Sequence, residues 1–428
     1  MSTSQSNTPK PSVAIVGAGL SGLCLAQSLL QAGFDVQVYE RDASPHIRRQ
    51  GYRITVDEHG AEALKQCLQP HLFEAVLATA SPRADVGYFR FTNQHLGEIF
   101  SLTFKNDKKD SELQAIGQVD RATLRTIMLS GLEGRVHFGK AATRVESTPD
   151  GATLYFADGS STSASVVVGA DGIHSALREQ ILPDCPPIDT GSRGIYGKTP
   201  LLKDGKSLVP KALENSGVMA LSAPGKVFFF TTMRFKELAQ KVFARLLPDQ
   251  EAPVSGDYVM WAVVLPKEEL PENVWKLDTK ALHQFALTVS SEYHPVLRCF
   301  VENADIDYTV VTTLSAATQP KTWPASRATL MGDAVHVMPP TGAHGGNTAL
   351  RDAALIAEKL KDAVQSGTPL EQAIQEYQDE MLPYAFKEVK ESMVMLGRGN
   401  IKNPLVRWLM MSVLPWFHSL WGTPLTTE

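Results

Sequence analysis

Three glycines near the start of the chain have the spacing of a loop that binds a dinucleotide. Gly17, Gly19 and Gly22 follow a short apolar strand, expected at Ser12–Val16, and open a segment with apolar residues at helical spacing. In such a loop the first glycine permits a tight turn, the second lets the backbone approach a pyrophosphate, and the third lets the helix pack against the strand. The helix N-terminus adds free N–H groups and a positive dipole end. The pattern predicts a dinucleotide site.

An acidic residue stands where the ribose of such a dinucleotide would need an acceptor. Glu40 ends a second expected strand, Val36–Tyr39, and lies 23 residues after Gly17. Its carboxylate would accept a hydrogen bond from a ribose 2′-hydroxyl, which argues against a 2′-phosphate there. The next residue, Arg41, would reach adenine, phosphate or flavin, or else be solvated. At this point the dinucleotide is either NAD or FAD.

Two glycine–aspartate pairs further along each lie between an expected strand and an expected helix. Asp171-Gly172 follows an apolar strand at residues 165–168, and Gly332-Asp333 follows one at residues 328–331. The second pair leads into the turn Pro339–Gly342 and a helix expected from about Thr348. An ordinary β–α turn would explain either pair alone. The glycine loop followed by the two pairs in this order is a specific signal, although each motif alone is not.

In these motifs the chain resembles the single-component FAD-dependent aromatic hydroxylases, the para-hydroxybenzoate hydroxylase-like flavin monooxygenases. The loop Gly17–Gly22 matches the family's dinucleotide fingerprint, Asp171-Gly172 its DG motif and Gly332-Asp333 its GD motif, while Arg121 matches a flavin-contacting arginine. The resemblance runs from about residue 12 to residue 380. It implies an α/β fold with a Rossmann-like FAD-binding domain of the glutathione reductase type, a discontinuous substrate domain built on a β-sheet, and a C-terminal helical segment.

The resemblance also implies roles for individual residues. Asp333 would bind the ribitol hydroxyls of FAD, and the following turn would line the flavin. The N–H groups that begin the next helix would face the flavin N1/C2=O edge and favour the anionic reduced ring. The implied cofactor-binding residues are Gly17, Gly19, Gly22, Glu40, Arg41, Arg121, Asp171, Gly172, Asp333, Pro340, Gly342, Gly345, Gly346 and Asn347. Where the family usually has Gly-Gln or a similar pair, this chain has Ala343-His344, and His344 is a candidate catalytic residue.

Arg53 is the second candidate catalytic residue. Ile54 and Val56 alternate as strand residues that face one side, which sends Arg53 to the other side. In the resembled fold this stretch passes beside the isoalloxazine ring. An arginine there would bind an anionic or carbonyl-bearing substrate, or steady the charge of reduced flavin. The alternative is a surface arginine paired with Asp57 or Glu58.

The remaining segments carry no nucleotide-binding motif, and we expect them to form the substrate-binding domain. We expect an FAD-binding domain at residues 1–82, 114–186 and 314–378, a substrate-binding domain at 83–113 and 187–313, and a C-terminal helical region at 379–428. In the resembled family the substrate segments form one sheet over the flavin, with an apolar pocket, although each aromatic residue alone is equally a core residue. The apolar-aromatic runs expected as strands are Tyr88–Phe91, Met219–Leu221, Val227–Thr232 and Tyr258–Val264.

Composition excludes several classes of function. The 428 residues carry a net charge of −5, which gives no electrostatic case for nucleic-acid binding. The four cysteines lack the spacing of zinc or iron–sulfur ligands and favour reduced thiols in a cytoplasmic protein. The tail Ile401–Trp421 predicts short amphipathic helices packed on the body, or else peripheral membrane contact through its aromatic residues. The oligomeric state is expected to be monomer or homodimer.

These observations predict an FAD-dependent monooxygenase. The resemblance implies that NADPH or NADH reduces FAD, that O2 forms a C4a-hydroperoxyflavin, and that one oxygen atom passes to a phenolic, polyketide-derived or indolic molecule. The one GxGxxG motif leaves the nicotinamide cofactor to bind transiently near the DG loop. Epoxidation and Baeyer–Villiger insertion use the same cofactor and stay open. A carrier like the GDP-dissociation inhibitors would not need the intact GD loop, and an NAD dehydrogenase would need a catalytic His or Lys motif near the fingerprint.

Overall fold

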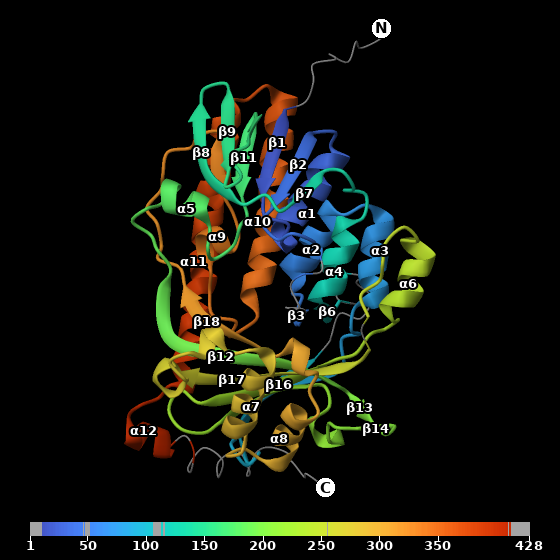
Figure 1. Cartoon of the computed structure of the whole chain (residues 1–428), viewed down its shortest axis with the longest axis vertical. Helices are drawn as coiled ribbons and strands as arrows, with labels where there is room; N and C mark the ends of the chain where they lie inside the picture. Colours follow the sequence, from blue (N-terminus) through green and yellow to red (C-terminus); the bar gives the residue numbers. More distant parts are fainter. Residues whose placement is uncertain are drawn as a thin grey trace.

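The chain folds into two layers (Figure 1). A cavity lined by residues of both layers lies between them. This computed structural model describes residues 11–45, 47, 52–105, 113, 116–254, 256–409 and 411. The upper layer is a parallel sheet with helices around it, and the lower layer is a large mixed sheet with two helices beneath it. This arrangement confirms the predicted α/β class.

The upper layer is built on a five-stranded parallel sheet. Its strands, in spatial order, are β19 (Ala328–Leu330), β11 (Val166–Gly169), β1 (Ser12–Val16), β2 (Asp35–Glu40) and β7 (Val136–Phe138). The central strands are almost wholly apolar, as expected for parallel strands buried on both faces. Because all five run the same way, the loops after β1, β11 and β19 leave the sheet at the same edge. That edge faces the cavity.

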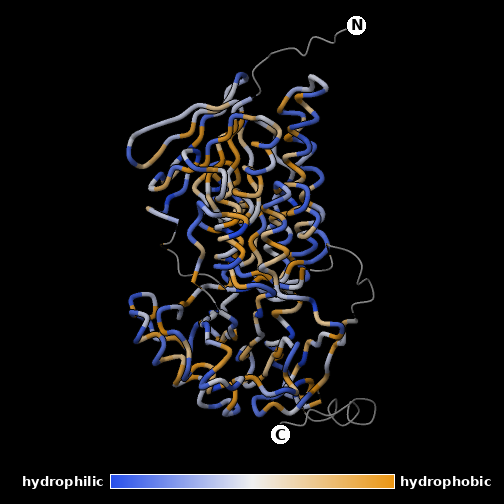
Figure 2. Tube along the Cα trace, turned by 90° about the vertical axis from the view of Figure 1, so that its right-hand side faces the viewer, coloured by the Kyte–Doolittle hydropathy of each residue, from blue (hydrophilic) through white to orange (hydrophobic). Residues whose placement is uncertain are grey.

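Helices surround this sheet. The helices are α1 (Leu20–Gln31), α2 (Glu58–Cys67), α3 (Pro70–Thr79), α4 (Arg121–Leu129), α5 (Ala176–Ile181), α6 (Ala239–Leu246), α9 (Asp333–His336), α10 (His344–Ser366) and α11 (Leu370–Gly399). Helix α1 packs against α10, α2 and α4, and α10 packs against α11. Figure 2 shows the hydrophobic stretches concentrated in the centre of this layer. A small antiparallel sheet of β8 (Ala142–Thr148), β9 (Gly151–Phe156) and β10 (Ser161–Ala164) packs beside β11 and β1 in the upper part of this layer (Figure 1).

Helix α10 begins four residues earlier than the sequence predicts. The apolar pattern predicts a helix from about Thr348, while the resemblance implies that Gly345, Gly346 and Asn347 lie at its start. In the structure the helix starts at His344, directly after Ala343, whose φ of 63° places it in the left-handed region. The tertiary contacts of the following residues therefore outweigh the local propensity of the two glycines.

The lower layer is a seven-stranded sheet. Its strands, in spatial order, are β18 (Val310–Ala316), β12 (Ile188–Pro200), β17 (Tyr258–Pro266), β16 (Val227–Met233), β15 (Ser216–Leu221), β4 (Val86–Asn93) and β5 (Glu98–Lys105). All four apolar-aromatic runs identified in the sequence are strands of this one sheet, so that prediction is confirmed. One face packs on α7 (Thr279–Ser290) and α8 (Pro295–Glu302) and buries Phe228, Phe230 and Trp261 completely.

A two-stranded ribbon lies between the two layers. It pairs β3 (Arg53–Thr55) with β6 (Gln118–Asp120) in antiparallel register, with Arg53 opposite Asp120. The remaining short elements are β13 (Leu202–Lys203), β14 (Lys206–Ser207), η2 (Lys211–Leu213), η3 (Lys267–Glu269), η4 (Val274–Lys276) and η5 (Ile306–Tyr308). The ribbon brings residues far apart in the sequence to the boundary of the cavity.

The C-terminal region contains α11 and the short helix α12 (Pro404–Trp408). Trp408 on α12 is exposed, while the other aromatic residues of the predicted tail, Trp416, Phe417 and Trp421, lie outside the described residues. Membrane contact through this tail stays a prediction. No helix in the described part of the chain has both the length and the apolar composition needed to cross a bilayer.

Gly197 provides a test of the packing in the lower sheet. It lies opposite Trp261 in the register, and a Cβ at Gly197 would lie 2.0 Å from an indole carbon. Because Trp261 is completely buried and hydrogen-bonded to Thr199, it has little room to move. We expect Gly197→Ala to lower the free energy of unfolding by about 1–3 kcal/mol. Urea unfolding measures this, and Gly256→Ala, where no atom is within 4 Å of the new Cβ, is the control.

Candidate functional site

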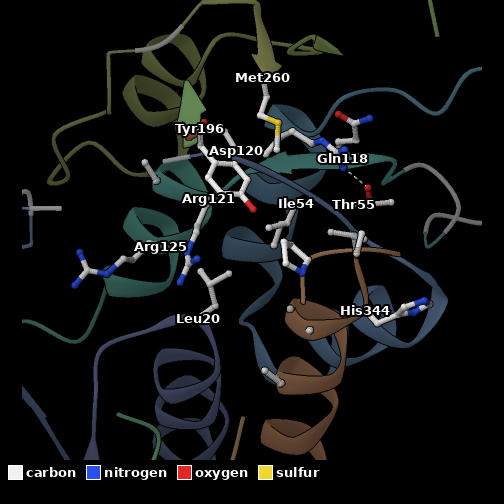
Figure 3. Close-up of a pocket in the computed structure, with 18 of the residues that line it drawn as sticks. Leu20, Ile54, Thr55, Gln118, Asp120, Arg121, Arg125, Tyr196, Met260 and His344 are labelled. Atoms are coloured by element: carbon white, nitrogen blue, oxygen red, sulfur yellow. Dashed lines mark hydrogen bonds between the residues drawn. The ribbon is translucent and has the colours of Figure 1, made fainter. Parts of the chain in front are cut away.

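One cavity of about 2210 Å³ receives residues from both layers. Figure 3 shows Tyr196 and Met260 reaching toward it from the lower sheet, opposite Leu20 at the start of α1. Ile54 of the ribbon lies between these two walls. The cavity therefore has one wall made of loops and helix starts and another made of an aromatic sheet face.

The glycine loop owes its shape to close contacts with its neighbours. Gly17 has a φ of +108°, and a Cβ on it would lie 2.3 Å from the carbonyl oxygen of Ala170. A Cβ on Gly22 would lie 2.1 Å from the carbonyl oxygen of Gly17. At Gly19 a Cβ would meet nothing within 4 Å. The first and third glycines thus serve packing, and the second leaves its backbone open to the cavity, as the motif predicts.

Glu40 holds this loop from the end of β2. Its two carboxylate oxygens accept hydrogen bonds from the backbone N–H groups of Ala18 and Asp42, at 2.8 and 2.9 Å. An ionised carboxylate has about four lone-pair sites, so acceptors remain for a ribose hydroxyl. Arg41 follows as an exposed residue at the cavity wall. The predicted ribose-binding role of Glu40 is compatible with this geometry.

An arginine that the motifs did not single out supports the same loop. Arg125 on α4 donates from Nε to the carbonyl oxygen of Ala18 at 2.9 Å and from its guanidinium to that of Pro45. Arg121, one turn earlier, is exposed and lines the cavity. A second arginine at i+4 from a family arginine is the signal that would have pointed to Arg125.

The DG loop places a partly satisfied carboxylate beside the glycine loop. Asp171 accepts a hydrogen bond from the N–H of Ala176 at 3.1 Å, and its other oxygen is buried without a partner among the described residues. Burial raises the pKa of Asp171 above its usual value. Gly172 follows with a φ of +78°. The free oxygen is an acceptor that a bound hydroxyl or amide would satisfy.

The GD loop is held by a fully buried carboxylate that the sequence motifs do not include. Asp352 on α10 accepts from the N–H of Gly332 at 2.8 Å and from the hydroxyl of Tyr384 at 2.7 Å. The ring of His336 lies 2.6 Å from the same carboxylate, and neither side chain has any exposure. These contacts fix the turn, whose Gly332 has a φ of +62°, and leave Asp333 exposed in the cavity wall.

A helical pattern would have revealed Asp352. It lies three residues after Ala349 and four before Ile356, both buried on α10. An acidic residue at helical spacing within an apolar face indicates a buried partner.

The turn before α10 is compact. Pro340 is exposed at the cavity, and Gly342 has a φ of +93° with the ring of His344 packed 2.6 Å from the place of its Cβ. The Nδ1 of His344 lies 2.9 Å from the carboxylate of Glu388 on α11. Figure 3 shows His344 projecting from the first turn of α10 away from Tyr196. The catalytic role of His344 stays a prediction. The structure shows that its side chain contacts α11.

The two glycines of α10 and Asn347 differ in what they face. Gly345 and Gly346 line the cavity, and a Cβ on Gly346 would lie 3.7 Å from the Ile54 side chain. The Asn347 side chain is buried and used within the protein, because its amide donates to the carbonyl oxygens of Thr55 and Ala343 and its oxygen accepts from the Asp57 N–H, at 3.0–3.1 Å. Asn347 thus ties β3 and α2 to the start of α10, and direct contact with a cofactor stays a prediction.

Arg53 lies at the cavity wall with its side chain directed toward Thr55, as the strand alternation predicts. The alternative of a surface pair is not observed. Arg53 has no ion pair within the described part of the chain, and the Asp57 carboxylate accepts from the N–H of Gly60 at the start of α2. Arg53 therefore lies at the cavity, as expected, and its role there stays a prediction.

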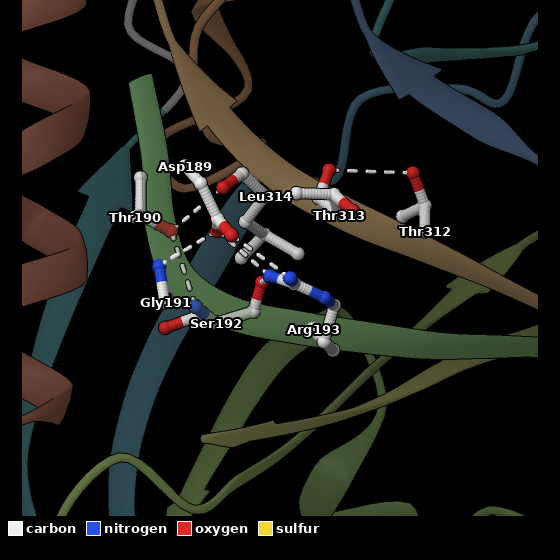
Figure 4. A network of polar contacts seen from close by, with 8 residues as sticks. All are labelled: Asp189, Thr190, Gly191, Ser192, Arg193, Thr312, Thr313 and Leu314. Carbon is white, nitrogen blue, oxygen red and sulfur yellow. Dashed lines mark hydrogen bonds and ion pairs between the residues drawn. The ribbon is translucent and has the colours of Figure 1, made fainter. Parts of the chain in front are cut away.

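The strand that joins the two walls bends between them. Strand β12 starts beside the upper layer and crosses into the lower sheet, with a bulge between Asp189 and Arg193. Figure 4 shows Arg193 held by both Asp189 oxygens, at 2.8 and 2.9 Å, while Asp189 also accepts from the N–H of Gly191. The Arg193 guanidinium lowers the pKa of Asp189 to about 2. This ion pair spans the bulge at which β12 passes from one wall to the other.

The His336–Asp352 pair makes stability depend on pH. Burial alone would lower the pKa of His336, but the Asp352 carboxylate outweighs it and the net pKa is raised. A raised folded pKa means that the stabilisation is complete below the unfolded pKa of about 6.5 and is lost as pH rises through the folded pKa. We expect the difference in unfolding free energy between the native chain and His336→Gln to be largest below about pH 6.5 and to shrink as pH rises through the folded pKa of His336.

Urea unfolding at pH 6 and pH 9 measures this difference. His59→Gln, at an exposed histidine on α2, is the matched control and should show no such trend. A pH-independent difference for His336→Gln would contradict the charged pair.

The groups at the cavity fit a flavin dinucleotide. The start of α1 has no side-chain cap, so its N–H groups are available to phosphates. Asp171 has a buried oxygen without a partner, and Asp333 is exposed at the wall. Together they supply donors for a pyrophosphate and acceptors for hydroxyl groups, which is the set that FAD requires.

Comparisons with known proteins agree with this geometry. A family model described as an FAD binding domain matches residues 10–196 and 302–392. A dual O-methyltransferase/FAD-dependent monooxygenase of Cercospora beticola is 32% identical over 94% of this chain and 48% of that protein. The 6-hydroxynicotinate 3-monooxygenase of Pseudomonas fluorescens is 27% identical, over 82% of this chain and 83% of that protein.

A solved structure from Photorhabdus luminescens, described as a candidate FAD-containing monooxygenase, has a TM-score of 0.76 and 28% identity, and the match covers 92% of this chain and all of that one. The chain spans about half the length of the dual-function relatives it matches. The family match covers more than half of the chain and includes the glycine loop, the DG motif and the GD motif. The chain therefore belongs to the FAD-binding family of para-hydroxybenzoate hydroxylase-like flavin monooxygenases.

Proposed function

We propose that this chain is an FAD-dependent monooxygenase that uses NADPH or NADH and O2 to insert one oxygen atom into an aromatic or other electron-rich small molecule. The observation that carries the proposal is the shared cavity, in which the dinucleotide loops and an aromatic sheet face open onto the same space. A carrier protein would need no reactive-ring site between two such walls. Hydroxylation is the preferred reaction, with epoxidation and Baeyer–Villiger insertion as alternatives.

The size of the cavity supports two occupants. Its volume of about 2210 Å³ is more than twice the upper end of the ~300–1,000 Å³ typical of small-molecule sites. A cofactor bound by the loop wall would leave room against the sheet wall for an aromatic substrate. The size also favours a polycyclic or polyketide-derived substrate over a single small ring.

Each wall has a distinct task in this proposal. Bound FAD supplies the redox and oxygen-activating chemistry. The open backbone at Gly19 and the N-terminus of α1 would hold its pyrophosphate, Glu40 would hold a ribose, and Asp333 would hold the ribitol. The N–H groups at the start of α10, including those of Gly345 and Gly346, would favour negative charge on the flavin ring.

The sheet wall holds the substrate and excludes water. Phe229, Met260 and Tyr196 line the cavity from neighbouring strands of the lower sheet. Flat aromatic and polarizable side chains suit a planar ring, and their apolar surface keeps water from the reacting atoms. The proposed substrate-binding domain at residues 83–113 and 187–313 contains all three.

The nicotinamide cofactor is proposed to bind transiently. The described residues contain one parallel sheet with one glycine loop of the dinucleotide type. The exposed His174, which lines the cavity just after the DG loop, marks the place where a nicotinamide would approach. The preference between NADPH and NADH is left to experiment.

The dual-function relatives support a second reaction directly before or after the proposed oxygen insertion. Their name joins the monooxygenase to an O-methyltransferase in one protein. Aromatic hydroxylation creates a phenolic hydroxyl, which is the group that an O-methyltransferase modifies. We therefore propose that methyl transfer consumes the product of this chain or supplies its substrate.

The central experiment measures NADPH and NADH oxidation by the FAD-loaded protein with phenolic, polyketide-derived and indolic compounds. We expect a compound that stimulates oxidation and yields a product heavier by one oxygen atom. The product structure separates hydroxylation from epoxidation and ring insertion. Protein that takes up no FAD would refute the proposal, and protein that binds FAD but consumes no reductant would favour the carrier.

Asp333 provides a direct test of the loop wall. Asp333→Ala removes the acceptor proposed for the ribitol hydroxyls, and a hydrogen bond to a charged group is worth roughly 1.5–3 kcal/mol. We expect FAD affinity to fall about ten- to a hundredfold. Fluorescence titration of the apoprotein measures it, with Asp150→Ala in the exposed turn between β8 and β9 as control. Unchanged affinity would remove Asp333 from the site.

A further inference from the structure

Three side chains with metal-binding atoms meet where the start of α10 contacts α11. His344 is the first residue of α10, and Glu388 and Glu391 lie about one turn apart on α11. A ring nitrogen of the histidine and one oxygen of each carboxylate all lie within 4.8 Å of one another. His344 and Glu388 are half-buried and Glu391 is exposed, so an ion can reach the cluster from solvent. None of the three is among the residues proposed to bind FAD.

The contact between His344 and Glu388 is close without being a hydrogen bond. Nδ1 of His344 lies 2.9 Å from Oε2 of Glu388, yet this oxygen is buried and has no hydrogen-bond partner within the described residues. A metal ion about 2.0–2.2 Å from both atoms would use both lone pairs, and at these bond lengths a separation of 2.9 Å corresponds to an angle of roughly 90° at the ion. That angle is the one between neighbouring ligands of an octahedral ion.

Ser392 adds a second unpartnered group at the same contact. It follows Glu388 by four residues on α11, so the two side chains lie on one face of the helix. The Ser392 side chain is completely buried, and its hydroxyl has no partner among the residues that the structure describes. Its carbonyl oxygen accepts a hydrogen bond from the Thr341 hydroxyl at 2.7 Å, which places Ser392 against the turn that leads to His344. A water molecule bound to an ion would satisfy the buried hydroxyl.

The two carboxylates have little compensating charge of their own. Lys387 lies 3.8 Å from Glu391 in an exposed pair on the same helix, and such a pair contributes little to stability. Glu388 has no lysine or arginine at ion-pair distance in the described part of the chain. Like charges about one turn apart on a helix repel each other. A divalent cation between them would replace this repulsion by attraction.

We propose that His344, Glu388 and Glu391 bind a divalent transition-metal ion that joins the start of α10 to α11. One imidazole nitrogen and two carboxylate oxygens suit Mn²⁺, Co²⁺ or Zn²⁺ better than Mg²⁺, which takes oxygen ligands and keeps much of its water. Affinity should rise from Mn²⁺ through Co²⁺ to Zn²⁺ when the ligands are the same. Three protein ligands leave further coordination positions to water. This site goes beyond the proposed oxygen insertion and does not depend on it.

A metal ion at this position would stabilise a turn that borders the cavity. Gly345 and Gly346 follow His344 in the first turn of α10, and both line the cavity. The ligands come from two helices that only the folded chain brings together. An ion that binds the folded chain and not the unfolded one raises the stability of the fold by mass action. Zn²⁺ should therefore raise the melting temperature of the protein.

Isothermal titration with ZnCl₂ tests the site on the FAD-loaded protein, prepared without a histidine tag and treated with EDTA. We expect one Zn²⁺ per chain, weaker binding of Mn²⁺, and little competition from excess Mg²⁺. Glu388→Gln and Glu391→Gln keep the size of each side chain and remove its charge. Each should weaken Zn²⁺ binding at least about tenfold and reduce the Zn²⁺-induced rise in melting temperature.

His59→Gln is the matched control. His59 lies 4.0 Å from Glu62 on the exposed face of α2, and this pair has no third ligand among the described residues. Its substitution should leave Zn²⁺ binding unchanged, and equal FAD content shows that all variants are folded. No Zn²⁺ binding, or equal binding by the native chain, Glu388→Gln and Glu391→Gln, would overturn the inference. Because the titration requires no turnover, its result is independent of the proposed oxygen insertion.

Discussion

The site depends on how closely two backbone loops approach each other at one edge of the parallel sheet. Gly17 and Ala170 come so near that no side chain fits on Gly17. Because β1 and β11 are parallel neighbours, the loops after them leave the sheet at the same edge. The open backbone of Gly19 and the carboxylate of Asp171 line the same cavity beside this contact. The helix starts then point their N–H groups into it.

The third loop is held by a different force. Asp352 is completely buried and would be costly as an isolated charge, yet it is satisfied by a backbone N–H, a tyrosine hydroxyl and a histidine. These partners come from the GD loop, α9 and α11, so one carboxylate of α10 joins its helix to three other elements. Breaking one contact leaves a buried charge unpaired, which couples the shape of the loop to the packing of two long helices. Asn347 makes a similar link from α10 to β3 and α2.

The cavity exists because two differently built walls are kept apart. The loop wall supplies polar groups in fixed positions, and the sheet wall supplies aromatic surface. The bend in β12, stabilised by the Asp189–Arg193 pair, carries the chain from one wall to the other. The β3–β6 ribbon lies between them and brings Arg53 to the point where the two chemistries meet. A reactive cofactor on one side and a planar ligand on the other require such a division.

The features that depend on local residue spacing can be predicted without the fold. The glycine loop, the DG and GD pairs and the apolar strands are readable because a strand, a tight turn and a helix start each need particular residues a few positions apart. The apolar pattern predicts α10 from about Thr348, four residues later than its observed start at His344, because the first turn of this helix carries no apolar stripe. The buried Asp352 network, the support of Ala18 by Arg125 and, within the described residues, the unpartnered Nε of Arg53 depend on the tertiary structure. The hydrogen-bonded groups in the first two cases lie between 16 and 107 residues apart in the sequence, so only the folded chain determines which groups meet.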